Sequence, residues 1–555
     1  MAFSQEIPAE PLDVIVAGYG PAGATIAGLL GRRGWRVAVL DQAAAIYDKP
    51  RAITADHEAL RVLQEIGIAD EVAAMSTPHP GTDYTGLEGQ VIKRFYPGSD
   101  EPLGWMQNWM FEQPKLEGSM RRAVQRMPSV LTLLQHQLLE VSQDADSVEA
   151  RVCRLTDGTT HTLRARWLVA ADGASSTVRK QFSPAIEDLA FDEWWLVVDA
   201  WVRGPVELPS RCVQYCRPSR PGTYIVGPDA LRRWEIKMLP GETPQQFQDH
   251  AEVWRVLGEF VDPSGLEHCR TAIYRFHALV VEQWRHGRVF LLGDAAHQMP
   301  PFLGQGLCAA VRDAFNLAWK LDAVMCGRAT QQLLDSYTEE RKRHVRTVVG
   351  HAKAFGLIIG ELDEQAARER DKRLEAELVS GAAQTIRAQF TPGLVTGLID
   401  RDVEGVPSVG AGELFVQPWV REGDAQWQRL DDVLGANFAI VATSSEVLSA
   451  FDEQTRESWK ALEGRLIQIQ PQALAANGGA CDAWVLQERE ALFNGWLERL
   501  GAVAAVVRPD RYVYGVACSA EELRRLVHEL AQKMFQADAA CVSASCDEDC
   551  IAVSP

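Results

Sequence analysis

Short, wholly apolar runs alternate with helix-spaced apolar residues along much of the chain. Residues 12–17 (LDVIVA) and 36–40 (RVAVL) have the pattern of buried strands, and residues 24–33 between them have that of a helix. The buried-strand pattern returns at residues 167–171 (WLVAA) and 289–292 (VFLL). Strands and helices that alternate in this way predict an α/β fold built on a parallel sheet.

The pattern changes between residues 183 and 263, where short alternating segments such as LVVDAWV and GTYIVGP are separated by turns. This predicts an antiparallel sheet inserted into the α/β domain. A single sheet laid over a bound ligand would close a mostly apolar cavity. Aromatic side chains that could line this cavity, or could instead be buried in the core, are Trp194, Trp195, Tyr215, Tyr224 and Trp234.

Glycines follow the first predicted strand in the arrangement that binds a dinucleotide. Gly18 allows a tight turn, Gly20 lets the backbone approach a pyrophosphate, and Gly23 lets the helix pack on the strand. Asp41 ends the second strand, where an acid can bind ribose hydroxyls. The strand, helix, strand and terminal acid together make this fingerprint specific, and no second one follows another strand.

A second motif begins where residues 289–292 end at Gly293-Asp294, which puts a carboxylate at the carboxyl end of a strand. A proline loop and then Gly304-Gln305-Gly306 lead into helix-spaced residues from Leu307 to Leu321. Such a loop presents backbone N–H groups and the positive end of a helix dipole to a phosphate or a reduced flavin ring. The alternative is an ordinary strand–loop–helix crossover in which Asp294 caps the turn.

A third motif, Asp172-Gly173, follows the strand at residues 167–171, with Arg179 seven residues after Asp172. With a GxGxxG, a DG and a GD motif in this order, the chain resembles the single-component FAD-dependent aromatic hydroxylases, the p-hydroxybenzoate and phenol hydroxylase group. Within that group it is most similar to the 3-(3-hydroxyphenyl)propanoate hydroxylases. Further segments that carry the resemblance are PRA (50–52), DHEAL (56–60), RRWE (232–235), RDAFNLAWKL (312–321) and RPDR (508–511).

The resemblance implies a Rossmann-like FAD-binding domain of the p-hydroxybenzoate hydroxylase type, formed by residues 1–182 and 264–390. Residues 183–263 would be the inserted substrate-binding sheet, and the Gly/Pro-rich residues 391–412 a linker. Residues 413–555 would be a thioredoxin-like domain. This last segment contains no CxxC, so we expect a structural or oligomer-forming role and no thiol–disulfide chemistry.

The resemblance also implies the residues of the site. Those expected to bind FAD are Gly18, Gly20, Pro21, Ala22, Gly23, Asp41, Arg51, Gln113, Leu139, Asp172, Asp294, Pro301, Gly304, Gly306, Leu307 and Cys308. The residues expected to act on the substrate are Pro301, His57, Asp56 and Arg233, with His297 as a further candidate for the proton relay. Plainer roles stay open: a surface charge for Arg51, a helix cap for Asp56, a polar residue at a helix start for Gln113 and a buried histidine for His297.

In the resembled enzymes NADH or NADPH reduces FAD, and O2 then adds to give a flavin hydroperoxide that hydroxylates a phenol. The chain is therefore expected to act on a phenolic acid, ortho to its OH. The Pro301 carbonyl would accept the phenol's hydrogen bond, and Arg232 or Arg233 would bind the carboxylate. Alternatives are another phenol, resorcinol-like or polycyclic, and a non-catalytic flavin redox protein. A flavin-dependent halogenase is disfavoured because its WxWxIP motif is missing.

The 555 residues carry a net charge of −19 and have a pI near 5.2, which argues against nucleic acid or an anionic membrane as a partner. The start, MAFSQEIPAEPLD, lacks the regions of a secretory signal, and no apolar run is long enough to span a bilayer. The eleven cysteines are scattered, and Cys541, Cys546 and Cys550 do not have zinc-site spacing. We therefore expect a cytoplasmic protein with reduced thiols and no metal, with a homodimer among its expected assemblies.

Overall fold

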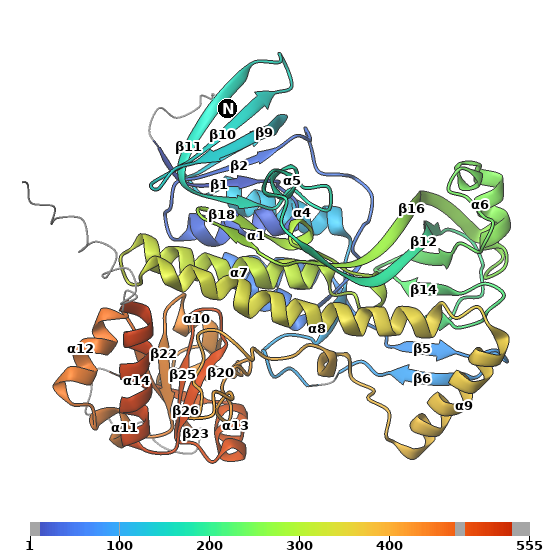
Figure 1. The fold of residues 1–555 in the computed structure, drawn as a ribbon. Helices are drawn as coiled ribbons and strands as arrows, with labels where there is room; N and C mark the ends of the chain where they lie inside the picture. The colour runs from blue at the N-terminus through green and yellow to red at the C-terminus, as the bar shows by residue number, and fades with distance from the viewer. Residues whose placement is uncertain (1–10, 99, 472–482, 536–555) are drawn as a thin grey trace, which may run out of the picture. The chain divides into compact units, whose positions relative to one another are not determined.

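The computed structural model describes residues 11–98, 100–471 and 483–535, so the chain's start and the Cys541, Cys546 and Cys550 cluster lie outside the described residues. The chain forms two compact units, coloured by residue number in Figure 1. The first consists of residues 1–315 and 341–392, and the second of residues 316–340 and 393–555. No helix in the described part of the chain is long and apolar enough to cross a bilayer.

The first unit contains the predicted parallel sheet. Its strand order is β17-β18-β11-β1-β2-β8, with β9 and β10 added as an antiparallel extension of β11. The strands are β1 (Leu12–Ala17), β2 (Val37–Asp41), β8 (Val130–Leu134), β9 (His136–Gln143), β10 (Val148–Arg154), β11 (Thr160–Ala170), β17 (Arg285–His286) and β18 (Val289–Leu291). Val14, Ile15 and Val16 of β1 are completely buried, as expected for a strand covered on both faces.

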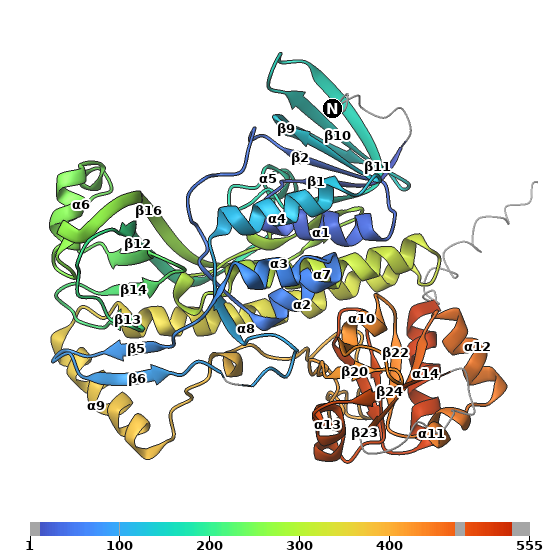
Figure 2. The same ribbon diagram turned by 180° about the vertical axis from the view of Figure 1, so that it is seen from behind.

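Helices pack against the sheets of this unit. Those of the first unit are α1 (Pro21–Arg32), α2 (His57–Ile66), α3 (Ala69–Ala74), α4 (Gln113–Gln125), α5 (Thr177–Phe182), α6 (His250–Leu257) and α9 (Glu364–Ser380). Two longer helices, α7 (Gly306–Met325) and α8 (Asp335–Ile359), pass from one unit into the other. Helices α1 and α4 pack against each other beside the parallel strands (Figure 2). Three short strands, β3 (Thr54–Asp56), β4 (Thr77–Pro78) and β7 (Asn108–Met110), form a small separate sheet.

The inserted antiparallel sheet is larger than the sequence predicts. Its order is β19-β16-β12-β15-β14-β13-β5-β6. The strands are β5 (Thr82–Thr85), β6 (Val91–Phe95), β12 (Ile186–Val202), β13 (Cys212–Tyr215), β14 (Gly222–Val226), β15 (Leu231–Lys237), β16 (Leu266–Val281) and β19 (His297–Gln298). Strands β5, β6 and β16 lie outside residues 183–263. β5 pairs in parallel with β13, so the edge that the insertion alone would expose is covered.

The register of this sheet separates its two faces. One face carries Leu196, Val198, Tyr224, Trp234 and Ile236, which form an apolar cluster with Val253, Val256 and Leu257 of α6. Figure 1 shows α6 beside these strands. The opposite face, here called the inner face, carries the alternate residues. Paired positions across the strands place on it Thr82, Tyr84, Trp195, Val197, Asp199, Cys212, Gln214, Thr223, Arg233 and Glu235. A face with several buried polar side chains is typical of a ligand cavity.

The second unit contains a sheet of order β21-β20-β24-β23-β22-β25-β26. Its strands are β20 (Trp419–Arg421), β21 (Gln428–Arg429), β22 (Ala439–Ala442), β23 (Arg465–Pro471), β24 (Trp484–Glu488), β25 (Ala504–Val507) and β26 (Val513–Ala517). Its helices are α10 (Leu430–Leu434), α11 (Ser445–Ser449), α12 (Glu453–Ala461), α13 (Leu492–Leu500) and α14 (Ala520–Phe535). β22 is parallel to β23 and antiparallel to β25, and β26 closes a hairpin before α14, which gives the thioredoxin-like arrangement.

The segment predicted as a linker, residues 391–412, is packed into this second unit. Leu394 and Ile399 are almost fully buried in a cluster with Ala411 and Tyr512. Trp319, from the part of α7 in the same unit, packs edge-on against Phe438 with ring centroids 5.6 Å apart. The glycines and prolines of residues 391–412 therefore bend a packed segment, and they do not mark a free connection.

Candidate active site

The glycine loop between β1 and α1 fits a bound pyrophosphate. A Cβ at Gly18, whose φ is +99°, would lie 2.2 Å from the Ala171 oxygen, and one at Gly23 would lie 1.9 Å from the Gly18 oxygen. A Cβ at Gly20 would meet no atom of the chain within 4 Å. Gly18 and Gly23 are thus required by the fold itself, whereas Gly20 faces open space at the start of a helix. Pro21 and Ala22 follow as the first residues of α1, where backbone N–H groups have no intrahelical acceptor.

Asp41 is fixed at the end of β2 by its neighbours. Its carboxylate accepts hydrogen bonds from the backbone N–H of Tyr19 at 3.1 Å and of Ala43 at 2.8 Å. Arg121 of α4 lies 3.6 Å from the same carboxylate, donates to the Tyr19 carbonyl at 2.7 Å and covers the Tyr19 ring. Sequence reasoning missed Arg121, because nothing in its local helical pattern separates it from a surface charge. Leu139 lies in the middle of β9.

Arg51 and Gln113 are connected through a third residue, Glu117. Gln113 accepts a hydrogen bond from the Ala52 N–H at 2.5 Å and donates to Glu117 at 2.6 Å. Arg51 donates to the same Glu117 oxygen at 3.1 Å while its side chain stays 47% exposed. The chain therefore holds the Arg51 loop against the start of α4 and leaves part of the guanidinium accessible to an anionic group.

The DG and GD motifs are joined by Arg179. It donates to the carbonyl oxygens of Asp294 at 3.1 Å and of Ala295 at 2.9 Å. One oxygen of Asp172 caps α5 by accepting from Thr177 and Val178, while the other is buried and has no partner in the part of the chain that the structure describes. An orphaned buried acceptor beside these motifs fits a hydroxyl donor from a cofactor.

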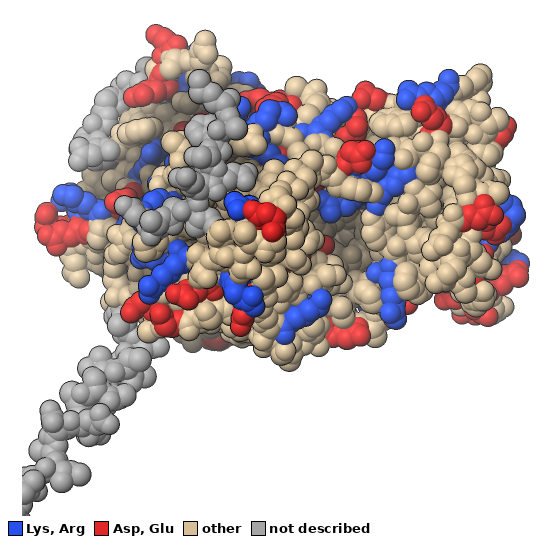
Figure 3. Space-filling view, turned by 90° about the horizontal axis from the view of Figure 1, so that it is seen from above, with Lys and Arg blue, Asp and Glu red and all other residues tan. Residues whose placement is uncertain are grey.

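Asp294 lies in a recess. Its side chain is exposed, yet surrounding protein desolvates the carboxyl enough to raise its pKa, an effect that His297, Arg51 and Arg179 only partly oppose. A carboxyl that is both accessible and closely surrounded is suited to hydrogen-bonding a ligand hydroxyl. The molecule is hollowed on the face seen from above, and blue Lys and Arg side chains stand around the hollow (Figure 3), as suits an anionic cofactor.

The loop before α7 turns at Gly304, and its Pro301 carbonyl already accepts a hydrogen bond within the chain. Gly304 has φ +67° and its N–H donates to the Pro301 carbonyl at 2.7 Å. This carbonyl, predicted to meet the phenol, therefore already accepts one hydrogen bond and retains one lone pair. Gly306, Leu307 and Cys308 form the first turn of α7, whose N–H groups lack intrahelical acceptors. Cys308 is fully buried, and burial raises the pKa of its thiol.

Asp56 is an anchored carboxylate. It caps α2 by accepting from the Ala59 N–H at 3.2 Å, and it pairs with Arg312 of α7. Burial opposes ionisation, but Arg312 holds the pKa of Asp56 below its ordinary value. Arg312 also pairs with Glu58 and donates to the Gln305 side chain at 2.9 Å. These contacts match the helix-cap role left open for Asp56, and its part in the proton relay stays a prediction.

Two histidines were candidates for the proton relay: His297 is buried, whereas His57 keeps part of its surface exposed. Burial lowers the pKa of His57 to about 4, and its Nδ1 has no partner among the described residues. His297 contacts Asp313 at 2.7 Å through Nε2, and Asp313 is also paired with Arg341 at 2.9 Å. His297 is thus part of a buried network beneath the GD motif, which matches the buried-histidine role left open for it, and its part in the proton relay stays a prediction.

The expected carboxylate clamp at Arg232 and Arg233 is corrected. Arg233 is buried and paired side-on with Asp199, with Nε–Oδ1 2.7 Å and Nη2–Oδ2 3.1 Å. Its remaining donors reach the carbonyls of Pro50 at 3.2 Å and Arg51 at 2.5 Å. Arg232 points to the other face of the sheet, where it donates to carbonyls of its own turn, including Asp229 at 3.0 Å. Arg233 is thus held by Asp199, Pro50 and Arg51, whereas Arg232, whose Nε has no partner among the described residues, lies on the face opposite to the inner face.

Of the five aromatic candidates for the cavity lining, Trp195 is on the inner face. Its ring meets that of Phe302, from the proline loop, at 4.9 Å, and both rings contact Phe276 at 6.0 Å. Tyr224 and Trp234 pack against each other in the cluster under α6 instead. Tyr215 packs against Phe260 at 5.2 Å, and Trp194 is 41% exposed.

Sequence reasoning missed a carboxyl on the inner face, Glu235. Burial raises its pKa from the ordinary 4.5 to about 7, although Arg233 lies 3.9 Å away and opposes the shift. Near it, Thr223 donates to Gln214 at 2.5 Å, and both are buried. Alternation along β15 could have indicated Glu235, but the sequence does not show which face of the sheet meets the cavity.

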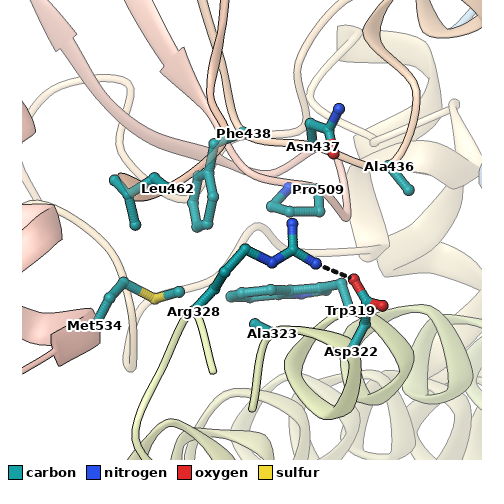
Figure 4. Close-up of a pocket in the computed structure, with 10 residues that line it drawn as sticks. All are labelled: Trp319, Asp322, Ala323, Arg328, Ala436, Asn437, Phe438, Leu462, Pro509 and Met534. Atoms are coloured by element: carbon teal, nitrogen blue, oxygen red, sulfur yellow. Dashed lines mark hydrogen bonds and ion pairs between the residues drawn. The ribbon is translucent and has the colours of Figure 1, made fainter. Parts of the chain in front are cut away.

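A small hollow in the second unit holds no ligand site. Its lining includes the Trp319 ring, and Arg328 pairs there with Asp322 at 2.6 Å (Figure 4). The cavity volume of about 10 Å³ admits about one water molecule. Among the described residues, no group of His, Cys, Asp and Glu side chains could hold a metal ion.

Comparison with known proteins agrees with this geometry. Residues 11–352 match the FAD binding domain family, and residues 412–533 match the HcaD C-terminal domain. A protein of Comamonas testosteroni named 3-(3-hydroxy-phenyl)propionate/3-hydroxycinnamic acid hydroxylase is 33% identical over 573 aligned positions, covering 94% of this chain and 96% of its own.

Solved structures share the fold. The flavin-dependent monooxygenase PieE, in complex with FAD and substrate, superposes with a TM-score of 0.78 at 22% identity, over 95% of this chain and 100% of its own. Aklavinone-11 hydroxylase with FAD and aklavinone gives 0.74 at 24% identity, over 95% and 100%. The glycine loop, the DG and GD motifs and the inserted sheet thus occur together in one known architecture, and the chain belongs to the family of FAD-dependent aromatic hydroxylases, flavoprotein monooxygenases that use NAD(P)H and O2.

Proposed function

We propose that this enzyme hydroxylates a meta-substituted phenol with a short acid side chain, such as 3-(3-hydroxyphenyl)propanoate, ortho to its OH, to give a catechol. The observation that carries the proposal is the 33% identity, over 94% of the chain, to a protein named for that substrate class. The inner face of the sheet supports it, because Trp195 and Phe302 provide apolar contact for one ring and Gln214, Thr223 and Glu235 provide polar contacts.

We infer that FAD is held by the residues whose geometry fits it. The pyrophosphate would lie over Gly20 and the N–H groups of Pro21's helix, and the adenosine ribose would lie at Asp41 with Leu139 nearby. Hydroxyls of the ribityl chain would meet Asp294, and Arg51 would meet the phosphates. Backbone N–H groups of Leu307 and Cys308 would face the ring that becomes negative on reduction.

FAD, when bound and reduced by NAD(P)H, would activate O2, one atom of which goes to the phenol and the other to water. The chain's part is to exclude water, orient the phenol and accept its proton. The packed rings of Trp195, Phe276 and Phe302 would exclude water from one side of the substrate. The remaining lone pair of the Pro301 carbonyl would accept the phenol O–H, and Glu235, buried on the inner face with a pKa near 7, joins His57 and Asp56 as a candidate proton acceptor.

A panel of phenols tests the proposal. Each is incubated with holoenzyme and NADH or NADPH, and the catechol is quantified together with nicotinamide oxidation and hydrogen peroxide. We expect one catechol per nicotinamide oxidised with 3-(3-hydroxyphenyl)propanoate, and less coupled turnover with resorcinol-like or polycyclic phenols. Nicotinamide oxidation that yields only hydrogen peroxide with every phenol would contradict the hydroxylase assignment and favour a non-catalytic redox role.

We further infer a cytoplasmic enzyme that acts without nucleic acid or membrane and assembles as a homodimer. Every cysteine in residues 11–98, 100–471 and 483–535 is free, which fits a reducing compartment. Light scattering during size exclusion measures the assembly, and a monomer at micromolar concentration would contradict the dimer.

A further inference from the structure

Arg387 places a positive charge between the inserted sheet and the proline–glycine loop. It begins a single turn of 3-10 helix (Arg387–Phe390) that follows α9. Its Nη2 lies 3.5 Å from Thr82 Oγ1 on β5, and its Nη1 lies 3.9 Å from the point where a Cβ of Gly304 would be. Thr82 is on the inner face, and Gly304 follows the loop that carries Pro301 and Phe302. The guanidinium therefore reaches the region that the substrate ring is proposed to occupy.

The turn that carries Arg387 is anchored by its last residue. Phe390 packs edge-on against Phe95 of β6 at 5.7 Å, Phe355 of α8 at 5.0 Å and His351 at 5.3 Å. This packing fixes the backbone from which the arginine extends. The side chain itself is only partly buried, so it remains accessible to a ligand.

The charge of Arg387 is not paired with an acidic side chain in the described part of the chain. Among the described residues, no carboxylate lies within ion-pair distance of Arg387, and its Nε is buried without a hydrogen-bond partner. Other buried arginines of this unit are paired: Arg220 with Glu242 at 2.7 Å and Arg233 with Asp199 at 2.7 Å. A half-buried guanidinium that keeps free donors is costly unless a ligand supplies the acceptor.

Three titratable groups that interact with Arg387, namely His79, Tyr84 and Cys212, are neutral, and Arg211 adds a second positive charge. Burial, and after it the charges of Arg387 and Arg211, hold the pKa of His79 well below its ordinary value. Burial raises the pKa of Tyr84 and of Cys212. The Tyr84 hydroxyl is fully buried and also lacks a partner in the described chain. The surroundings thus offer positive charge and an unused hydroxyl donor, and the carboxylate of Asp83 beside Arg211 is engaged by Arg211 at 2.9 Å and by Arg94 at 2.8 Å.

We propose that Arg387 binds the carboxylate of the substrate's acid side chain and so selects phenolic acids over neutral phenols. This inference rests on the proposed function. An arginine edge with a free Nε and Nη donor matches the two oxygens of a carboxylate. The assignment also explains how a family member whose Arg233 is held by the protein, and whose Arg232 lies on the opposite face of the sheet, can recognise an acid.

The test compares an acid with an uncharged analogue of similar shape. Holoenzyme carrying Arg387→Met is assayed with 3-(3-hydroxyphenyl)propanoate and with 3-(3-hydroxyphenyl)propan-1-ol. We expect the KM for the acid to rise at least tenfold relative to that for the alcohol. Arg387→Lys, which keeps the charge but not the paired geometry, should give an intermediate value. The matched control is Arg232→Met. Arg232 lies on the face of the inserted sheet opposite to the inner face, so the ratio of the KM for the acid to the KM for the alcohol should stay at the wild-type value.

Binding is measured independently of turnover, by the change in flavin absorbance on titration with 3-phenylpropanoate, which has no OH to be hydroxylated. Weaker binding to Arg387→Met than to wild type supports the inference even if no phenol is hydroxylated, in which case only the proposed function fails. Equal affinities, or equal effects on acid and alcohol, overturn the inference and leave the hydroxylase intact. A raised KM for NADH or NADPH, with the acid unaffected, would assign the charge to the nicotinamide cofactor and also overturn it.

Discussion

The guanidinium of Arg233 pairs side-on with the carboxylate of Asp199 across the neighbouring strands β15 and β12, and the same guanidinium donates to the backbone of Pro50 and Arg51. One buried ion pair therefore ties the substrate sheet to the loop that presents Arg51. Removing Arg233 leaves the buried Asp199 with Arg270, 3.5 Å away, as its remaining partner, and losing a buried partner typically costs up to about 3–5 kcal/mol.

We therefore expect Arg233→Met to lower the free energy of unfolding by about that amount and to reduce flavin content. Denaturant titration measures the free energy of unfolding. The ratio of flavin absorbance at roughly 450 nm to protein absorbance at roughly 280 nm measures the flavin content. Arg232→Met is the control and should change neither. Because Arg270 also pairs with Asp199, an Asp199→Leu, Arg233→Met double variant should recover only part of the stability, and no recovery at all would show that the charge left on Asp199 is not the cause.

The glycine loop predicts opposite outcomes for two similar substitutions. At Gly20 a side chain would meet no atom of the chain within 4 Å, whereas at Gly23 a Cβ would lie 1.9 Å from the Gly18 oxygen. We expect Gly20→Val to fold but to purify with depleted FAD, and Gly23→Val to be unstable even as apoprotein. Circular dichroism and flavin content of both proteins measure this. A yellow, fully loaded Gly20→Val protein would contradict the cofactor assignment.

Glu235 should make stability depend on pH between about 4.5 and 7. Its pKa in the folded protein, about 7, is raised mainly by burial, so the folded state binds this proton more tightly than the unfolded state does. The ionised, buried form therefore destabilises the protein above pH 7, by about 3 kcal/mol at most, and the penalty is relieved as the pH falls toward 4.5.

The corresponding variant is Glu235→Gln, which resembles the protonated acid. We expect it to melt at a higher temperature than wild type at pH 8 and at the same temperature near pH 5. Thermal unfolding across this range gives the comparison. A difference that is constant with pH would show that Glu235 does not titrate there.

The single dinucleotide fingerprint predicts how nicotinamide and substrate interact. With no second GxGxxG after a strand, NAD(P)H has no dedicated domain of that type and should react in a transient complex. A phenolic ligand that favours the reactive arrangement should then accelerate flavin reduction by shifting a conformational population. Anaerobic stopped-flow absorbance measures the rate. Identical rates with and without every phenol in the panel would refute the coupling.

The apolar runs at residues 12–17, 167–171 and 289–292 were sufficient to predict the parallel sheet, because buried strands carry their signal locally. The pairing of β5 with β13 was not predictable, since it joins residues more than a hundred positions apart with no common pattern. For the same reason, the positions of Asp56 and Arg233 in the chain did not reveal their partners Arg312 and Asp199. The type of each residue indicated which chemistry it could perform. Ion pairs between residues far apart in the chain decided whether its charge is available to a ligand.

The second unit is assembled from segments that are separated in the chain. Glu340 pairs at 2.8 Å with Lys320 and with Arg508, and Arg508 pairs with Asp510 at 2.7 Å, all within this unit and all buried. Residues 341–392, which belong to the first unit, intervene in sequence. A truncation after residue 392 would therefore strand Lys320 and Glu340 without Arg508. Residues 316–340 and 393–555 should therefore be exchanged together in a chimaera of two relatives. A chimaera that exchanges only residues 393–555 would combine Lys320 and Glu340 from one parent with the partners of these residues from the other.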